Sequence, residues 1–127
     1  MRSKLALLLV AAALLLSASA PLLAADATVL RVVVVNTDNP DAYLKEVEKG
    51  RAHNKRLEGS SQIRVWRARF AGEEAGTIVV SIEYPSLAAL AKDDAKSAAD
   101  AEFQAWLKGL DKVRKIVSDS LYTELKP

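Results

Sequence analysis

The stretch from Thr77 to Tyr84 constrains the fold of this chain more than any other. It reads Thr-Ile-Val-Val-Ser-Ile-Glu-Tyr, a composition typical of a β-strand. Pro85-Ser86 ends the strand, and an Ala/Leu-rich helical pattern begins at once. A strand that is apolar on both faces needs neighbours on both edges and cover on both sides. We therefore expect a central strand, with one face carrying Ile78, Val80 and Ile82 and the other carrying Thr77, Val79 and Ser81.

The N-terminal residues have the layout of a secretory signal peptide. Arg2 and Lys4 form a short basic head, residues 5–16 are an unbroken apolar run, and small residues follow. The apolar run is too short to span a membrane. We expect a signal peptide over residues 1–25, cleaved between residues 24 and 27, and one domain over residues 28–126. An uncleaved anchor is the alternative. The expected location is the periplasm or the outside of the cell.

The charge balance and the absence of cysteine exclude several classes of function. The sequence has 18 basic and 16 acidic side chains, and removal of Arg2 and Lys4 leaves 16 of each. A neutral chain argues against nucleic acid, or a membrane surface after signal cleavage, as the main partner. The sequence contains no cysteine, so disulfides, thiol nucleophiles and thiolate metal sites are excluded.

The remaining elements follow in the order strand, helix, strand, strand, helix, strand. Pro40 suits the first position of a helix that is capped by Asn39 or Asp38 and extends to about Leu57. The second helical region begins at Ser86, its apolar stripe is interrupted at residues 92–94, and Asp100 is a candidate cap for a last segment, so we expect a broken or kinked helix. The other expected elements are strands over residues 28–35, 62–71 and 113–125 and a hairpin over residues 72–76.

This order predicts an α+β fold, the ferredoxin-like βαββαβ sandwich with a four-stranded sheet. Right-handed crossovers place both helical regions on the same face of the sheet. Leaving roughly 500 Å² of apolar surface on the other face in water would forgo on the order of 10 kcal/mol. We therefore expect a homodimer through that face. A partly solvated face is the alternative, because Arg31, Arg67, Arg69 and Glu83 are assigned to it together with Val29, Val33, Val35, Ile63, Val65 and Val79.

The apolar strand before Tyr84-Pro85-Ser86-Leu87 and the broken helix with Asp100-Ala101-Glu102-Phe103 and Trp106 resemble the dimeric α/β-barrel superfamily. The pattern is most similar to its NIPSNAP-like branch, which often has a proline where Ala101 stands. The resemblance implies a face-to-face sheet dimer, in several members with a pocket between the sheet and the helices. Activities in the superfamily range from cofactor-free oxygenation of aromatic polyketides to haem degradation, muconolactone isomerisation and non-catalytic roles.

The site residues expected from the sequence cluster on the inward stripe of the first helix and on the aromatic positions. His53, the only histidine, and Asn54 are the candidate catalytic residues: His53 for proton transfer or as an axial ligand to haem, and Asn54 for positioning a ligand. Arg51 and Asn54 stand where apolar residues would be expected, so each needs a backbone partner, a salt bridge or a ligand. His53 as an edge residue and the two tryptophans as plain core are the alternatives. The expected ligand-binding residues are Tyr43, Arg51, Trp66, Phe103 and Trp106.

Two functions of different classes fit this pattern. The first is a periplasmic module that binds a small hydrophobic or aromatic ligand between the sheet and the helices. The second is a cofactor-independent monooxygenase or isomerase acting on such a molecule. No metal site is expected, because the acidic pairs Glu73-Glu74 and Asp93-Asp94 have no histidine near them in the sequence. No cofactor is expected either, because the chain has no phosphate-binding glycine loop.

Overall fold

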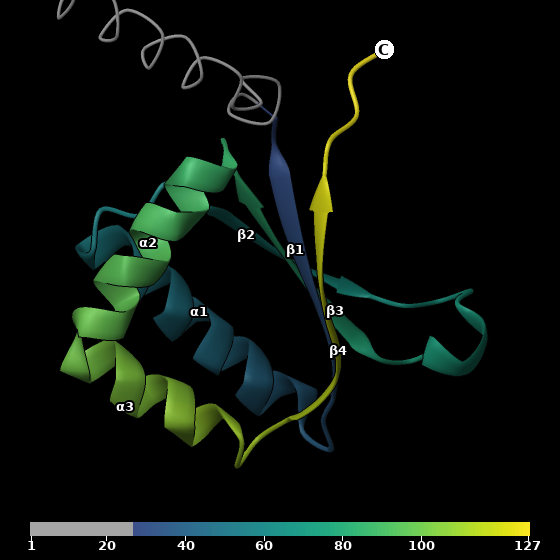
Figure 1. The fold of residues 1–127 in the computed structure, drawn as a ribbon. Coiled ribbons are helices and arrows are strands. Elements are labelled where there is room, and N and C mark those ends of the chain that lie inside the picture. The colour runs from purple at the N-terminus through teal and green to yellow at the C-terminus, as the bar shows by residue number, and fades with distance from the viewer. Residues whose placement is uncertain (1–26) are drawn as a thin grey trace, which may run out of the picture.

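A computed structural model describes residues 27–127. The expected signal peptide and its cleavage point lie outside the described residues. The secondary structure follows the predicted order, with the second helical region divided into α2 and α3 (Figure 1). The elements are β1 (Val29–Asn36), α1 (Pro40–Arg56), β2 (Gln62–Arg67), the short 3-10 helix η2 (Gly72–Glu74), β3 (Ile78–Tyr84), α2 (Leu87–Ala99), α3 (Ala101–Leu110) and β4 (Lys115–Thr123).

The four strands form one antiparallel sheet in the order β2-β3-β1-β4. The expectation that residues 77–84 form a central strand is confirmed, because β3 pairs with β2 on one edge and with β1 on the other. The register shifts where Val34 and Val35 of β1 pair with β4.

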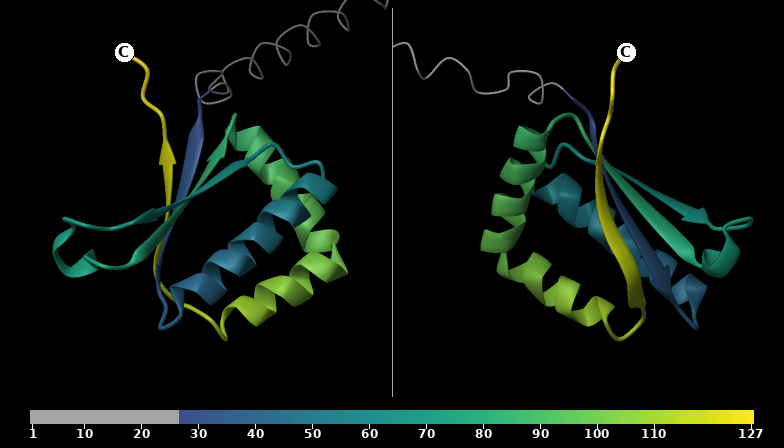
Figure 2. Two further views of the ribbon diagram at one scale, coloured as in Figure 1. Left: turned by 180° about the vertical axis from the view of Figure 1, so that it is seen from behind. Right: turned by 45° about the vertical axis from the view of Figure 1, so that its right-hand side comes forward.

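The helices cover one face of the sheet, and the two views in Figure 2 show the other face uncovered. The core lies between α1 and the covered face. It contains Tyr43, which is 2% exposed, and Val47, packed against side chains of β1 and β3. The predicted α+β ferredoxin-like arrangement, with helices on one face, is therefore correct. None of the helices within residues 27–127 is long and apolar enough to cross a membrane.

The assignment of side chains to the two faces is wrong for β1 and β2. Residues directly opposite each other in an antiparallel sheet share a face, and both Val33 and Val65 stand opposite Val80, which packs in the core. The register therefore turns Val29, Val33, Val35, Ile63 and Val65 toward the helices, together with Arg31 and Arg67. The alternation of side chains along a strand shows which residues share a face. It does not show which of the two faces the helices cover. Val79 and Glu83 were assigned to the uncovered face correctly.

The uncovered face retains apolar side chains of its own. Trp66 and Tyr122 are 53% and 55% exposed there. The Trp66 indole lies across the strand and donates a hydrogen bond of 2.8 Å to the Ser81 hydroxyl. The register places Leu30, Val32, Val34, Trp66, Val79 and Tyr122 on this face, which we call the open face.

The helix starts follow from their capping residues. The side chains of Asn39 and Ser86 accept hydrogen bonds from Ala42 N and Ala89 N, both at 3.0 Å, at the starts of α1 and α2. The Asp100 carboxylate accepts from Phe103 N at 2.8 Å at the start of α3. The predicted break at Asp100 is confirmed, whereas α2 continues through residues 92–94 without interruption.

Candidate functional site

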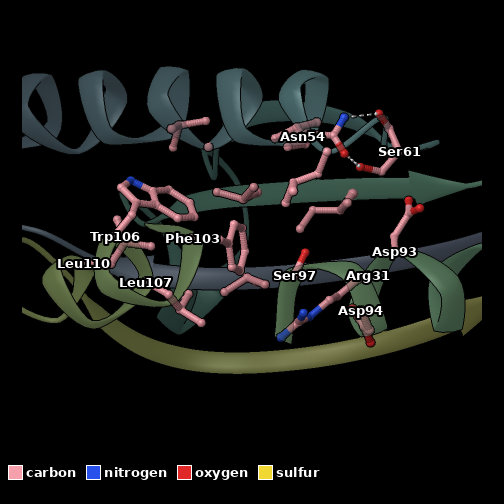
Figure 3. A pocket seen from close by; sticks show the side chains of 18 of the residues that line it. Arg31, Asn54, Ser61, Asp93, Asp94, Ser97, Phe103, Trp106, Leu107 and Leu110 are labelled. Atoms are coloured by element: carbon pink, nitrogen blue, oxygen red, sulfur yellow. Dashed lines mark hydrogen bonds between the residues drawn. The ribbon is translucent and has the colours of Figure 1, made fainter. Parts of the chain in front are cut away.

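A cavity of about 300 Å³ lies between the covered face of the sheet and the helices α1, α2 and α3 (Figure 3). This volume is at the low end of the range for small-molecule pockets, roughly 300–1,000 Å³. All four strands and all three α-helices contribute side chains to its wall.

The first end of the cavity is aromatic and apolar, because α3 turns Phe103, Trp106, Leu107 and Leu110 toward the sheet. The rings of Phe103 and Trp106 are in contact, with centroids 5.3 Å apart. The Trp106 indole also lies directly on the backbone of α1. A Cβ atom at Gly50 would come within 2.7 Å of Trp106 Cη2, so the helix approaches the ring closely only because residue 50 is glycine.

The second end of the cavity is closed by amide and hydroxyl groups from α1 and the turn before β2. Asn54 Nδ2 donates to the Ser61 carbonyl at 3.1 Å, and the Ser61 hydroxyl donates to Asn54 Oδ1 at 3.0 Å. Ser60 donates through its backbone N–H and its hydroxyl to Asp93 of α2, at 2.9 and 2.8 Å. These bonds tie α1, β2 and α2 together and give this end a fixed polar wall.

The side of the cavity next to β4 forms its mouth. Ile116 and Leu121 of β4 lie on the covered face of the sheet but are 43% and 52% exposed. No helix covers β4 among the described residues, so the cavity opens between this strand and α2–α3. On the sheet side of this opening, Arg31 of β1 forms a bidentate pair with Asp119 of β4, at 2.9 and 2.6 Å. The hydrogen bond with Arg31 lowers the pKa of the Asp119 carboxyl, and burial opposes this shift.

Tyr84 adds a buried phenol to the wall near the mouth. Burial raises the pKa of this phenol, the negative charge of Asp94 raises it further, and the positive charge of Arg31 opposes the shift. The phenol therefore stays protonated at neutral pH and can donate a hydrogen bond to a molecule bound in the cavity. Figure 3 shows Arg31 and Asp94 on the same side of the cavity, between α2 and β4.

The structure brings together four of the expected site residues, since Tyr43, Asn54, Phe103 and Trp106 line the cavity. Trp66 does not line it: the expectation for this residue is wrong, because the register places it on the open face, behind the sheet. Arg51 is also outside the lining. Its guanidinium donates to the Ile63 carbonyl at 3.2 and 2.9 Å and pairs with Glu48, so a backbone partner and a salt bridge satisfy it.

His53 lies behind the aromatic end of the cavity and does not line it. Its ring contacts Phe103 and Trp106, with centroids 5.9 and 5.4 Å apart. Its Nδ1 lies 3.0 Å from Arg56 Nη2, and Arg56 in turn binds Asp100. His53 therefore supports the two rings that form the wall.

Several polar lining residues were not foreseen. Arg31 interrupts the apolar run of β1, and a charge inside a buried strand is a signal that could have indicated a site. Asp119 and Arg114 come from the segment after α3, and only the register and the chain path place them at the cavity. Within residues 27–127 no group of three or more acidic or histidine side chains could hold a metal ion.

No family model matches this chain, and no curated protein matches its sequence. Solved structures share its fold. SnoaB, a cofactor-independent oxygenase from Streptomyces nogalater, has a TM-score of 0.60 and 15% identity, covering 80% of this chain and 96% of SnoaB. A NIPSNAP family protein from Agrobacterium tumefaciens has a TM-score of 0.57 and 19% identity over 79% of this chain and 93% of that protein.

A third similar structure is a conserved protein of unknown function from Bacteroides thetaiotaomicron, described as a possible oxidoreductase. It has a TM-score of 0.58 and 10% identity, and covers 79% of this chain and 100% of that protein. At these identities the similarity shows the fold alone. The fold expected from the resemblance to the dimeric α/β-barrel superfamily and its NIPSNAP-like branch is thereby confirmed.

Proposed function

We propose that this protein binds a small hydrophobic or aromatic molecule in the cavity between its sheet and its helices. The observation that carries the proposal is the cavity itself, with the rings of Phe103 and Trp106 at one end and the Asn54–Ser61 pair at the other. Such a combination of apolar walls and a few oriented polar groups is what small-molecule sites present. Filling the cavity with an aromatic body removes apolar surface of both partners from water.

Part of the proposal concerns assembly and location. A homodimer formed through the open face would bury Trp66 and Tyr122, which water otherwise reaches. Each subunit would then keep its own cavity on the far side of its sheet. The signal-like sequence of residues 1–25 supports export to the periplasm or the outside of the cell.

A cofactor-independent monooxygenase or isomerase is the second candidate. The similarity of fold to SnoaB and the position of Asn54 in the cavity wall favour it. In this alternative Asn54 contacts the substrate, and His53 positions the wall from behind Phe103 and Trp106. Loss of substrate turnover in Asn54→Ala, with binding retained, would distinguish the enzyme from a binding module.

The binding proposal is tested with a cavity-filling variant. Ser97 of α2 lines the cavity, so Ser97→Phe places a ring in the space that a ligand would occupy. The probe is 2-naphthamide, a neutral fluorescent aromatic, titrated against the folded protein. We expect Ser97→Phe to weaken binding by about tenfold or more, equivalent to about 1.4 kcal/mol.

The matched control is Ala95→Phe. Ala95 lies on the same helix but is exposed and outside the cavity lining. Both variants must melt cooperatively for the comparison to hold. Equal weakening of probe binding by the two variants would overturn the proposal.

A further inference from the structure

Arg114 is the feature of the cavity that neither the fold nor the binding proposal explains. It stands between α3 and β4 and lines the cavity. Its Cζ atom lies 6.0 Å from the centroid of the Tyr43 ring, so the guanidinium sits over an aromatic face in the wall.

The Nε donor of Arg114 is buried and lacks an acceptor among the described residues. None of the ion pairs in this part of the chain includes Arg114. A buried donor without an acceptor costs free energy, and native structures keep few such groups. The side chain as a whole is only part-buried and lines the cavity, so its Nη donors can bind an acceptor on a bound molecule.

The other two basic residues of the cavity wall are satisfied. Arg31 binds Asp119 through two nitrogens, and Lys96 Nζ donates to the Leu57 and Glu58 carbonyls at 3.2 and 3.4 Å. Lys96, like Arg114, is in no ion pair among residues 27–127, but it has two carbonyl acceptors, so Arg114 is the basic side chain of the wall with donors left over. Arg114 lies beside the apolar end of the cavity, because Leu110 and Arg114 are separated by a single turn.

The acceptor that fits is a single carboxylate. The guanidinium presents donors in a planar fork that matches the two oxygens of a carboxylate. A phosphate, which carries more negative charge, would meet greater repulsion from Asp93, Asp94 and Asp119 in the same wall. The charge of Arg114 already acts on this space, since it adds to the effect of Arg31 in lowering the pKa of Asp119.

We infer that the ligand of this cavity is an amphipathic carboxylic acid, whose carboxylate binds Arg114 and whose aromatic or short aliphatic body packs against Trp106 and Phe103. The inference rests on the proposed function and narrows it from any small hydrophobic molecule to an acid. Arg114 is then the specificity-determining residue of the site.

The test compares two probes of the same shape, 2-naphthoate with a carboxylate and 2-naphthamide with a neutral carboxamide, by calorimetric titration at pH 7. The wild type is expected to bind the acid about 10- to 100-fold more tightly than the amide, the usual advantage of hydrogen bonds to a charged group. Arg114→Gln should bind the amide like the wild type and lose the preference for the acid. Arg114→Lys should retain part of the preference, because it keeps the charge without the fork.

Arg69→Gln is the matched control, because Arg69 is exposed in the β2–β3 hairpin and outside the cavity wall. It should keep the wild-type preference. Binding of the amide to Arg114→Gln shows that this variant still folds. If the wild type does not prefer the acid, or if Arg114→Gln retains the preference, the inference is overturned while the binding proposal stands. If neither probe binds the wild type, both are overturned.

Discussion

At the scale of single residues, Asp100 joins the local and the tertiary structure of this protein. Its carboxylate caps α3 through Phe103 N and binds the Arg56 guanidinium at 3.0 and 2.6 Å. The hydrogen bond from Arg56, and then the one from Phe103 N, lower the pKa of Asp100 to about 2. The same carboxylate thereby fixes the start of the helix that carries both rings of the cavity wall.

This pKa predicts a dependence of stability on pH. A carboxyl whose pKa is lower in the folded state than in the unfolded state stabilises the fold above the unfolded value, about 3.9. That contribution is lost as the pH falls from about 4 to about 2. Asp100→Asn keeps a capping side chain but removes the charge, so its free energy of unfolding should decrease less steeply in this pH interval.

Urea unfolding at a series of pH values from 7 to 2 measures this slope. Glu73→Gln, which removes an exposed carboxylate of the β2–β3 hairpin, controls for the loss of one negative charge. If the free energy of unfolding of Asp100→Asn falls between about pH 4 and pH 2 as steeply as that of the wild type, Asp100 is not held in its charged form.

At the scale of elements, the boundary between α2 and α3 shows how much the local sequence determines. The cap at Asp100 was predictable because an Asp that is followed by apolar residues at helical spacing is typical of a helix start. The Asp100 backbone is extended, with φ −98° and ψ 111°. This conformation is also the one that a residue before proline prefers.

Ala101→Pro should therefore stabilise the protein. Position 101 is the first residue of α3, where proline is favoured, and the substitution restricts the unfolded chain. We expect a gain of about 0.4–1 kcal/mol in the free energy of unfolding, measured by urea denaturation. The contrasting variant Ala99→Pro, in the last turn of α2, should cost about 3 kcal/mol because it removes a helical hydrogen bond and clashes with the preceding turn. A loss of stability in Ala101→Pro would contradict this account of the boundary.

The assignment of faces could not be predicted in the same way. Ile63 and Val65 alternate with Arg64 and Trp66 in β2, and both sets contain residues suited to a core. Only the pairing of Val65 with Val80 decides that the aliphatic set faces the helices and that Trp66 faces away. Register depends on contacts that are distant in sequence. For the same reason the wall residues from α1 and α3 were foreseen, whereas Arg114 and Asp119 were not.

At the scale of the whole molecule, the sheet separates two surfaces with different proposed roles. The covered face carries the cavity, and the open face carries the apolar side chains that a second copy would bury. Trp66 is the largest of these side chains and is half exposed. A charge at this position would have to be buried in the proposed dimer, at a cost of several kcal/mol. Trp66→Glu should therefore give a folded monomer whose cavity is unchanged.

Native mass spectrometry of the protein purified from its own host, compared with Trp66→Glu and Ser97→Phe, tests both roles in one measurement. We expect the wild type to be a dimer that carries one small molecule per subunit. Ser97→Phe should be a dimer without the small molecule, and Trp66→Glu a monomer that still carries it. A wild-type protein that is monomeric at high concentration and carries no bound molecule would contradict the account.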